Sequence, residues 1–156
     1  MPIICAKNEH FFKKWSPEMA YVLGFFAADG SMYRTQRGSH YIEFQITDED
    51  LIYKIRNLFQ CDNKISIILR NVRHRPLYRL QIGSTILFTD LQVLGFAPKK
   101  TLSMAFPEVP EIYLHHFLRG YFDGDGNVWS GENHKHDRNC SSVVLFTTFI
   151  CGSEMF

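Results

Sequence analysis

The sequence predicts an α+β fold in which a unit of helix, two strands, helix, two strands and helix is followed by the start of a second such unit. An internal repeat, two helices that each end in an acidic turn, and alternating apolar and polar residues after each turn support this prediction. The chain has 156 residues, of which 46% are hydrophobic, enough for one core but too few for two independent ones. We expect a first unit over residues 1–107 and the start of a second over residues 108–156.

The repeat has an offset of 96 residues, at which Gly24, Phe26, Asp29 and Gly30 return as Gly120, Phe122, Asp125 and Gly126. The surrounding residues match in character, because Tyr21, Val22, Phe25 and Tyr33 are answered by Phe117, Leu118, Tyr121 and Trp129. Matches this dense within a short window indicate that one structural unit is used twice.

Each copy has the features of a helix. Ser16 is a suitable N-cap, Pro17 suits the first helical position, and Glu18 favours the positive end of the helix dipole. The second copy begins in a similar way at residues 110–111. We therefore expect helices that run to the Asp-Gly dipeptides at residues 29–30 and 125–126.

Alternation and capping predict the remaining elements. We expect strands over residues 31–36, 40–46, 64–70 and 77–82, and helices over residues 48–59 and 84–94. After a linker containing Pro98, Pro107 and Pro110, the second unit should add strands near residues 127–130 and 143–150, and residues 151–156 should begin its next helix. Counterparts of residues 52–100 do not follow, so part of the cover over Val143, Leu145, Phe146, Phe149 and Ile150 should be missing.

The composition excludes some classes of protein. The formal charge of +1 and the pI near 7.7 show no overall basic excess, so any nucleic-acid surface must be local. The four cysteines form no CxxC pair, and nothing resembles a signal peptide, so we expect a cytoplasmic protein, or one of an organellar stroma or matrix. No apolar run approaches the roughly 18 residues of a membrane span, so no membrane partner is expected.

One face of each motif helix is lined partly by small residues, with Ala20, Gly24 and Ala28 in the first helix and His116, Gly120 and Gly124 in the second. Packing through these stripes would bring Asp29 and Asp125 together at the negative ends of two helix dipoles, where a divalent cation relieves the repulsion. The alternative for each Asp-Gly is an ordinary helix end with glycine at C′. Asp123 has Ala27 as its counterpart and is better explained as a helix-end residue than as a metal ligand.

A second cluster is basic. Lys64, Arg70, Arg73, Arg75 and Arg79, with His74, lie between Asn63 and Gln81 without any acid. A strand pair with these cations can lie in a major groove, and Arg34, Gln36, Arg37, Gln45 and Gln81 can join that surface. The alternative is an ordinary solvated hairpin.

Two nine-residue segments carry a family resemblance. Val22-Leu-Gly-Phe-Phe-Ala-Ala-Asp-Gly30 and Leu118-Arg-Gly-Tyr-Phe-Asp-Gly-Asp-Gly126 resemble two copies of the LAGLIDADG motif. The resemblance implies a two-motif, single-chain homing endonuclease fold and site-specific cleavage of double-stranded DNA. It also implies Mg²⁺ or Mn²⁺ held by Asp29 and Asp125, and an origin in intron homing or as a free-standing gene.

The resemblance implies further site residues. Lys99 or Lys100 follows Pro98 where the family places a basic residue near the scissile phosphate, although a solvated lysine pair explains both equally well. Asp48 matches a polar position near the metals, and it is also a good helix N-cap. His134, His136 and Cys140 lack a fourth ligand for zinc and fit a flexible loop better.

Three other functions stay open. The chain could be an intron RNA maturase or a transcription regulator built on the same fold, or an inactive remnant. Retention of both Asp29 and Asp125 favours the enzyme, because a pure binder has no use for crowded carboxylates. The partial second unit also predicts a further C-terminal segment or a second chain as a partner.

Overall fold

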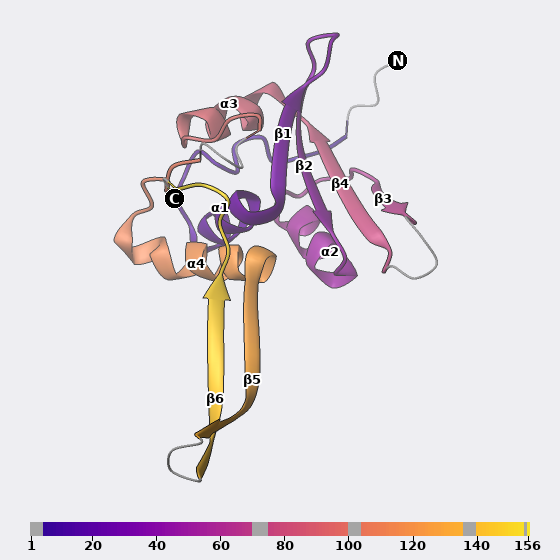
Figure 1. The fold of residues 1–156 in the computed structure, drawn as a ribbon. Coiled ribbons are helices and arrows are strands. Elements are labelled where there is room, and N and C mark those ends of the chain that lie inside the picture. Colours follow the sequence, from indigo (N-terminus) through magenta and orange to yellow (C-terminus); the bar gives the residue numbers. More distant parts are fainter. Residues whose placement is uncertain (1–4, 70–74, 100–103, 136–139, 155) are drawn as a thin grey trace.

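A computed structural model describes residues 5–69, 75–99, 104–135, 140–154 and 156. A four-stranded sheet is covered on one side by helices, and a long two-stranded hairpin projects away from this body (Figure 1). The elements are α1 (Pro17–Asp29), β1 (Gly30–Arg34), β2 (His40–Ile46), α2 (Glu49–Leu58), β3 (Ile65–Ile68), β4 (Leu77–Gly83), α3 (Thr85–Val93), α4 (Glu111–Asp125), β5 (Gly126–Lys135) and β6 (Cys140–Phe149).

Local signals fix where the helices begin. The Ser16 side chain accepts a hydrogen bond from the Met19 amide at 3.1 Å and caps α1. Asp48 caps α2 by accepting from the Leu51 amide at 3.1 Å, and Ser84 caps α3 by accepting from the Leu87 amide at 3.3 Å. Each cap satisfies an amide that has no partner within its helix, so the predicted starts of these three helices are confirmed.

The sheet has the antiparallel order β1-β2-β4-β3. Alternation along β2 directs Ile42, Phe44 and Ile46 toward the helices, where they are buried. Their neighbours Leu80 and Ile82 on β4 are also fully buried. α1 and α2 pack on this inner face, so the first unit has one continuous core and leaves the opposite, outer face of the sheet without a helix over it (Figure 1).

The second unit differs from the predictions in two places. β5 extends to Lys135, so residues 131–135, expected in a loop, are in a strand that continues the ladder with β6. Residues 151–154, expected to begin a helix, have no helical structure. The Ser153 hydroxyl instead donates to the Met104 carbonyl at 2.7 Å, so this segment turns back toward the linker between the two units.

The closest packing joins α1 to α4. A Cβ added at Gly24 would lie 1.9 Å from the backbone oxygen of Phe117, and one added at Gly120 would lie 1.9 Å from that of Tyr21. These two contacts are related by the 96-residue offset, so the helices meet around a local pseudo-twofold axis. Ala20 is buried in the same interface, whereas His116, its counterpart, is only half-buried.

The hairpin leaves apolar residues exposed. Alternation places Val128 on β5 and Val143, Leu145 and Phe149 on β6 on one face, and their exposure ranges from 54% to 80%. The equivalent residues of the first unit, such as Met32 and Phe44, are buried under helices. The predicted lack of cover over β6 is therefore confirmed.

We predict that Gly24→Ala or Gly120→Ala lowers the free energy of unfolding by about 3 kcal/mol or more, because the methyl group meets a backbone oxygen that cannot move away without separating the helices. Urea titration followed by circular dichroism measures the loss. Leu118→Ala, on the exposed side of α4, is the matched control and should cost less than about 1 kcal/mol. Equal losses in glycine and control variants would contradict the close packing.

We also predict that the apolar face of the β5–β6 hairpin drives self-association. Val143→Thr combined with Leu145→Thr should reduce concentration-dependent association in sedimentation velocity while preserving strand propensity. Val144→Thr, on the opposite face of the same strand, is the control and should leave association unchanged. Association that is insensitive to the double substitution would mean that another surface is responsible.

Candidate functional site

The two repeated acids stand at the ends of α1 and α4. Asp29 is the last residue of α1 and Asp125 the last residue of α4. Each is followed by a glycine with extended backbone, φ −77° in both cases, whose amide donates to the carbonyl of Phe26 or Phe122. The Asp-Gly dipeptides are therefore not helix ends with a left-handed glycine, which was the alternative explanation.

The two glycines are required for a different reason. A Cβ at Gly30 would lie 2.1 Å from Cδ2 of Phe26, and one at Gly126 would lie 2.1 Å from Cδ2 of Phe122. Both glycines thus let the chain pass over a phenylalanine ring as it turns from helix into strand. The same local solution in both copies presents the two acids in equivalent positions.

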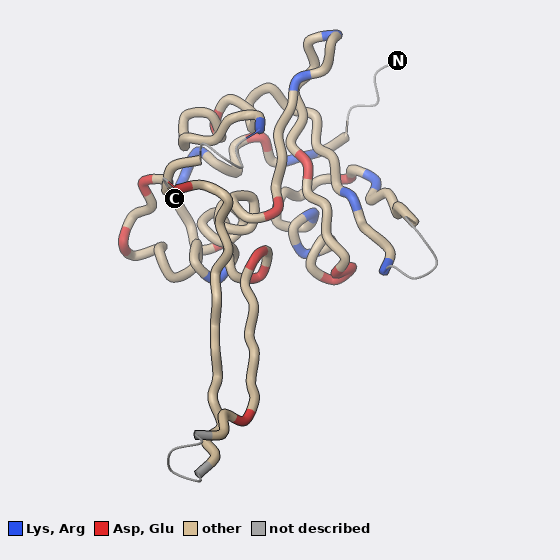
Figure 2. Tube along the Cα trace, in the orientation of Figure 1, with Lys and Arg blue, Asp and Glu red and all other residues tan. Residues whose placement is uncertain are grey.

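The packing of α1 on α4 brings these two helix ends together. Gly124 immediately precedes Asp125 in α4. A Cβ added at Gly124 would lie 3.6 Å from Oδ2 of Asp29 and 2.5 Å from Cβ of Ala28, both in α1. Figure 2 shows acidic positions where α1 passes into β1 and where α4 passes into β5. The predicted interface residues Ala28 and Gly124 therefore hold the two acidic ends side by side.

Tyr121 connects both acids. Burial, followed by a contact with Cys151 and by the charges of Asp125 and Asp29, raises the pKa of Tyr121 well above its usual value. Its hydroxyl donates to the Ile150 carbonyl at 2.6 Å. Tyr121 thus stays protonated and ties the end of the β5–β6 hairpin to the acidic end of α4.

A small cavity adjoins Asp125. It has a volume of about 40 Å³, and its lining consists of Ala27, Ala28, Met104, Tyr121, Asp125, Cys151 and Gly152. A polar cavity of this size accommodates an ordered water molecule. Water can therefore be held directly beside one of the two acids.

The donor set suits a hard divalent cation. Within the described ranges no cluster of three or more His, Cys, Asp or Glu side chains is suitable for a metal ion, so the site rests on two carboxylates. Mg²⁺ commonly binds through one or two carboxylates and completes its shell with water and phosphate oxygens. Asp29 and Asp125 match that requirement.

Asp123 has a structural partner. It accepts a hydrogen bond from the Tyr21 hydroxyl at 2.6 Å. Lys54 lies 4.5 Å and Arg119 5.0 Å from the centre of the same ring. Asp123 therefore joins α1 to α4 on the side of α2, which accords with its interpretation as a helix-end residue.

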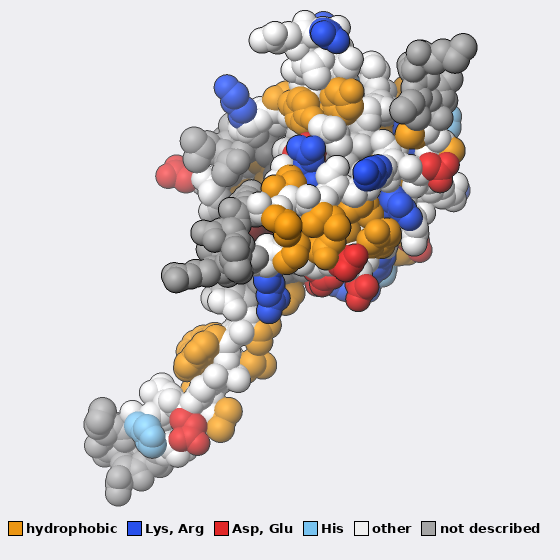
Figure 3. Space-filling model, turned by 90° about the vertical axis from the view of Figure 1, so that its right-hand side faces the viewer, with side chains coloured by type: hydrophobic (Ala, Val, Ile, Leu, Met, Phe, Trp, Pro, Cys, Tyr) orange, Lys and Arg blue, Asp and Glu red, His pale blue; other side chains and the backbone are white. Residues whose placement is uncertain are grey.

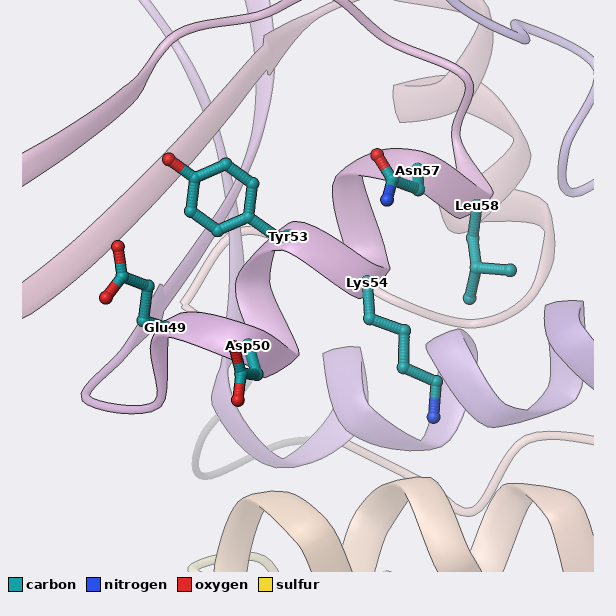
Figure 4. Close-up of a pocket in the computed structure, with 6 residues that line it drawn as sticks. All are labelled: Glu49, Asp50, Tyr53, Lys54, Asn57 and Leu58. Atoms are coloured by element: carbon teal, nitrogen blue, oxygen red, sulfur yellow. The ribbon is translucent and has the colours of Figure 1, made fainter.

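Asp48 is the N-cap of α2 and lines a shallow depression with Tyr21, Asp50, Leu51, Lys54 and Asp123. A second, open depression lies along the solvent side of α2, where Glu49, Asp50, Tyr53, Lys54, Asn57 and Leu58 come from a single helix (Figure 4). Neither includes Asp29 or Asp125. The role of Asp48 at the acidic pair remains a prediction, whereas its capping role is confirmed.

The predicted lysines follow α3. Lys99 is exposed, with left-handed backbone at φ 61°, and Lys100 lies outside the described residues. Arg70, Arg73 and His74 lie outside them as well. A catalytic role for either lysine stays a prediction.

Several predicted DNA-binding residues share the outer face of the sheet. Gln45 on β2 is paired with Arg79 on β4, and Gln81 lies two residues further along that strand. Exposed Lys64 and Arg75 precede β3 and β4. Lys and Arg positions mark β4 and the approach to β3 in Figure 2, and Figure 3 shows them among hydrophobic side chains on this side of the body.

Arg34 and Arg37 lie elsewhere. Arg34 pairs with His40, whose ring packs 4.6 Å from that of Phe88 on α3. Alternation therefore puts Arg34 on the helix side of the sheet, and Arg37 is exposed in the turn between β1 and β2. Any DNA contact made by these two residues must come from the hairpin tip rather than from the outer face.

Sequence reasoning missed Glu43. It lies on the outer face of β2 between Tyr41 and Gln45, yet it is only 7% exposed. Its carboxylate accepts hydrogen bonds from Gln45 and Gln81. The alternation of apolar and polar residues along residues 41–46 is the signal that places Glu43 on the same face as Tyr41 and Gln45.

The proposed zinc alternative gains no support. His134 is in β5, where its ring lies 3.8 Å from Glu132, and both are exposed. His136 lies outside the described residues, as does the side chain of Cys140.

In the described part of the chain no helix is long and apolar enough to cross a membrane.

Comparison with known proteins agrees with this architecture. Residues 16–91 match the family model of the LAGLIDADG-like domain. An uncharacterized protein of Methanocaldococcus jannaschii is 28% identical over 121 residues, which cover 75% of this chain and 41% of that protein. The chain thus spans less than half the length of this relative.

Solved structures show the same fold. The LAGLIDADG meganuclease I-AabMI, bound to uncleaved DNA, has a TM-score of 0.52 and 14% identity, with 85% of this chain and 66% of that chain covered. The homing endonuclease I-WcaI, bound to its DNA recognition sequence, has a TM-score of 0.54 and 16% identity, with 78% and 57% covered. Residues 16–91 therefore match the LAGLIDADG-like domain, and the chain has the fold of a large part of a LAGLIDADG homing endonuclease.

Proposed function

We propose that this chain supplies a site-specific nuclease for double-stranded DNA, in which Asp29 and Asp125 hold Mg²⁺ or Mn²⁺. The observation that carries the proposal is the reciprocal glycine contact between α1 and α4, since it holds two acids side by side at two helix ends. The chain covers only part of its solved relatives, so this activity is proposed for the whole protein to which the chain corresponds.

The electrostatics of the helix ends support a cation site. Each carboxylate lies at the end of a helix where the backbone dipole is negative, and each also repels the other. Packing that places the two carboxylates together has an electrostatic cost, which a bound cation would offset. A site with this built-in cost is better explained by metal binding than by stability.

The residues have separate roles in the proposed reaction. Asp29 and Asp125 would hold the divalent metal, which when bound would stabilise the negative charge that develops during phosphodiester displacement. The cavity beside Asp125 is large enough to hold a water molecule next to the site. Lys99 or Lys100 would stabilise charge on the scissile phosphate.

The outer face of the sheet is the proposed DNA-binding surface. Among the described residues no helix packs over it, so its side chains can enter a major groove, which admits two-stranded ribbons. This face carries Arg79, Gln45 and Gln81, and it is flanked by Lys64 and Arg75. Arg and Lys side chains can contact phosphates while the amides contact base edges.

We predict that Asp29→Asn or Asp125→Asn abolishes cleavage of a cognate site in Mg²⁺, because an amide cannot replace the charge that binds the metal. DNA affinity, measured by fluorescence anisotropy, should stay within about tenfold, or about 1.4 kcal/mol. Asp123→Asn, at the same helix end but bonded to Tyr21, is the matched control and should retain cleavage. Full cleavage by either test variant would refute the metal assignment, and DNA binding without any cleavage by the unmodified whole protein would favour a regulator or RNA maturase.

We predict that replacing Arg79, Arg75 or Lys64 with alanine lowers the salt dependence of DNA binding. Removing one cation that binds a phosphate should reduce the slope of log K against log salt concentration by about one unit. Lys14→Ala is the control, because Lys14 is exposed near the C-terminal end of α2, on the helix side of the sheet. Unchanged slopes in all three variants would place DNA on another surface.

A further inference from the structure

Glu43 occupies an unusual position for an acid. It lies in the middle of β2 on the proposed DNA-binding face. It is paired with Gln81 on β4, and Arg79 lies two residues before Gln81 on the same strand. Figure 2 shows an acidic position on β2 beside a basic position on β4. A carboxylate here opposes phosphate binding, so a general electrostatic role on this face does not explain it.

Neighbouring amides hold the carboxylate in place. Gln45 donates to Oε1 of Glu43, and Gln81 donates to Oε2 at 3.2 Å. The Gln81 amide also contacts the Tyr33 hydroxyl, so three strands contribute to the cluster. Burial and the charge of Glu43 raise the pKa of Tyr33, which keeps that hydroxyl protonated.

The ordered carboxylate retains acceptor capacity. An ionised carboxylate has about four lone-pair positions, and Gln45 and Gln81 each use one. The remaining positions accept hydrogen bonds but cannot donate any. Because Glu43 is only 7% exposed, little of its carboxylate is open to a partner, which restricts the partner to a projecting donor.

Among bases in the major groove, this requirement is met best by cytosine. Cytosine presents its N4 amino donor, whereas guanine presents two acceptors and thymine an acceptor and a methyl group. Adenine presents a donor at N6 but also the N7 acceptor beside it, which repels a carboxylate. A fixed acceptor without a donor therefore discriminates against all three other bases.

We infer that Glu43 selects cytosine at one position of the DNA target, by accepting a hydrogen bond from the N4 amino group. This inference rests on the proposed DNA-binding function and adds the base preference of one residue. Arg79 lies diagonally across from Glu43, and a guanidinium is suited to the O6 and N7 acceptors of guanine. The two side chains together match a C·G pair.

The test is selection from a double-stranded library with a randomised region, using the full chain in EDTA so that bound DNA is not cleaved. The unmodified chain should enrich cytosine at one position by about tenfold. Glu43→Gln should lose that enrichment, while preferences at other positions persist, because glutamine has both a donor and an acceptor. Glu108→Gln removes the same charge from the exposed linker and should leave the whole profile unchanged.

The outcomes separate this inference from the proposed function. Sequence-specific binding with no cytosine preference, or an identical profile for Glu43→Gln, overturns the role of Glu43 and leaves DNA binding intact. Failure of the unmodified chain to bind DNA overturns both. Melting temperatures of the three proteins verify folding, and a folded Glu43→Gln variant with a general loss of affinity at every position identifies Glu43 as structural and contradicts the inference.

Discussion

The contact between two helix backbones at Gly24 and Gly120 is the constraint on which the rest of the molecule depends. With no Cβ on either helix, a carbonyl of one occupies the space beside the other. The close approach fixes the relative direction of the two strand pairs that leave the helix ends, and it also brings Asp29 and Asp125 to the same place. Architecture and candidate chemistry thus have one physical origin.

Close packing and adjacent acids act against each other. Burial of residues 19–27 of α1 between the sheet and α4 stabilises the arrangement, whereas two carboxylates at negative helix ends destabilise it. The hydrogen bond from Tyr21 to Asp123 adds a further link between α1 and α4, and the apolar core holds the helices together. Repulsion that the fold tolerates at one defined point is typical of a functional site.

The two units show that the apolar residues of a similar strand pair are buried only where other elements pack on the strands. In the first unit, α2 and β4 complete the β1–β2 pair, and Phe44 is fully buried. In the second, the β5–β6 pair projects alone (Figure 1), and Phe149 is 54% exposed. In both units the glycine after the motif helix is paired with a phenylalanine, Gly30 with Phe44 and Gly126 with Phe149, although the second hairpin is longer.

The sequence by itself determined the repeat, the three capped helices, the strand order along the chain and the two acids, since these depend on local propensity and periodicity. It did not determine the length of β5 or the irregular path of residues 151–154, because hairpin pairing and the bond from Ser153 to Met104 overrode local preference. Only the tertiary structure shows that Asp123 accepts a hydrogen bond from Tyr21 and that Arg34 lies on the helix side of the sheet. It also shows that Glu43 is hydrogen-bonded by the amides of Gln45 and Gln81. Such placements depend on contacts between residues far apart in the chain, which periodicity does not encode.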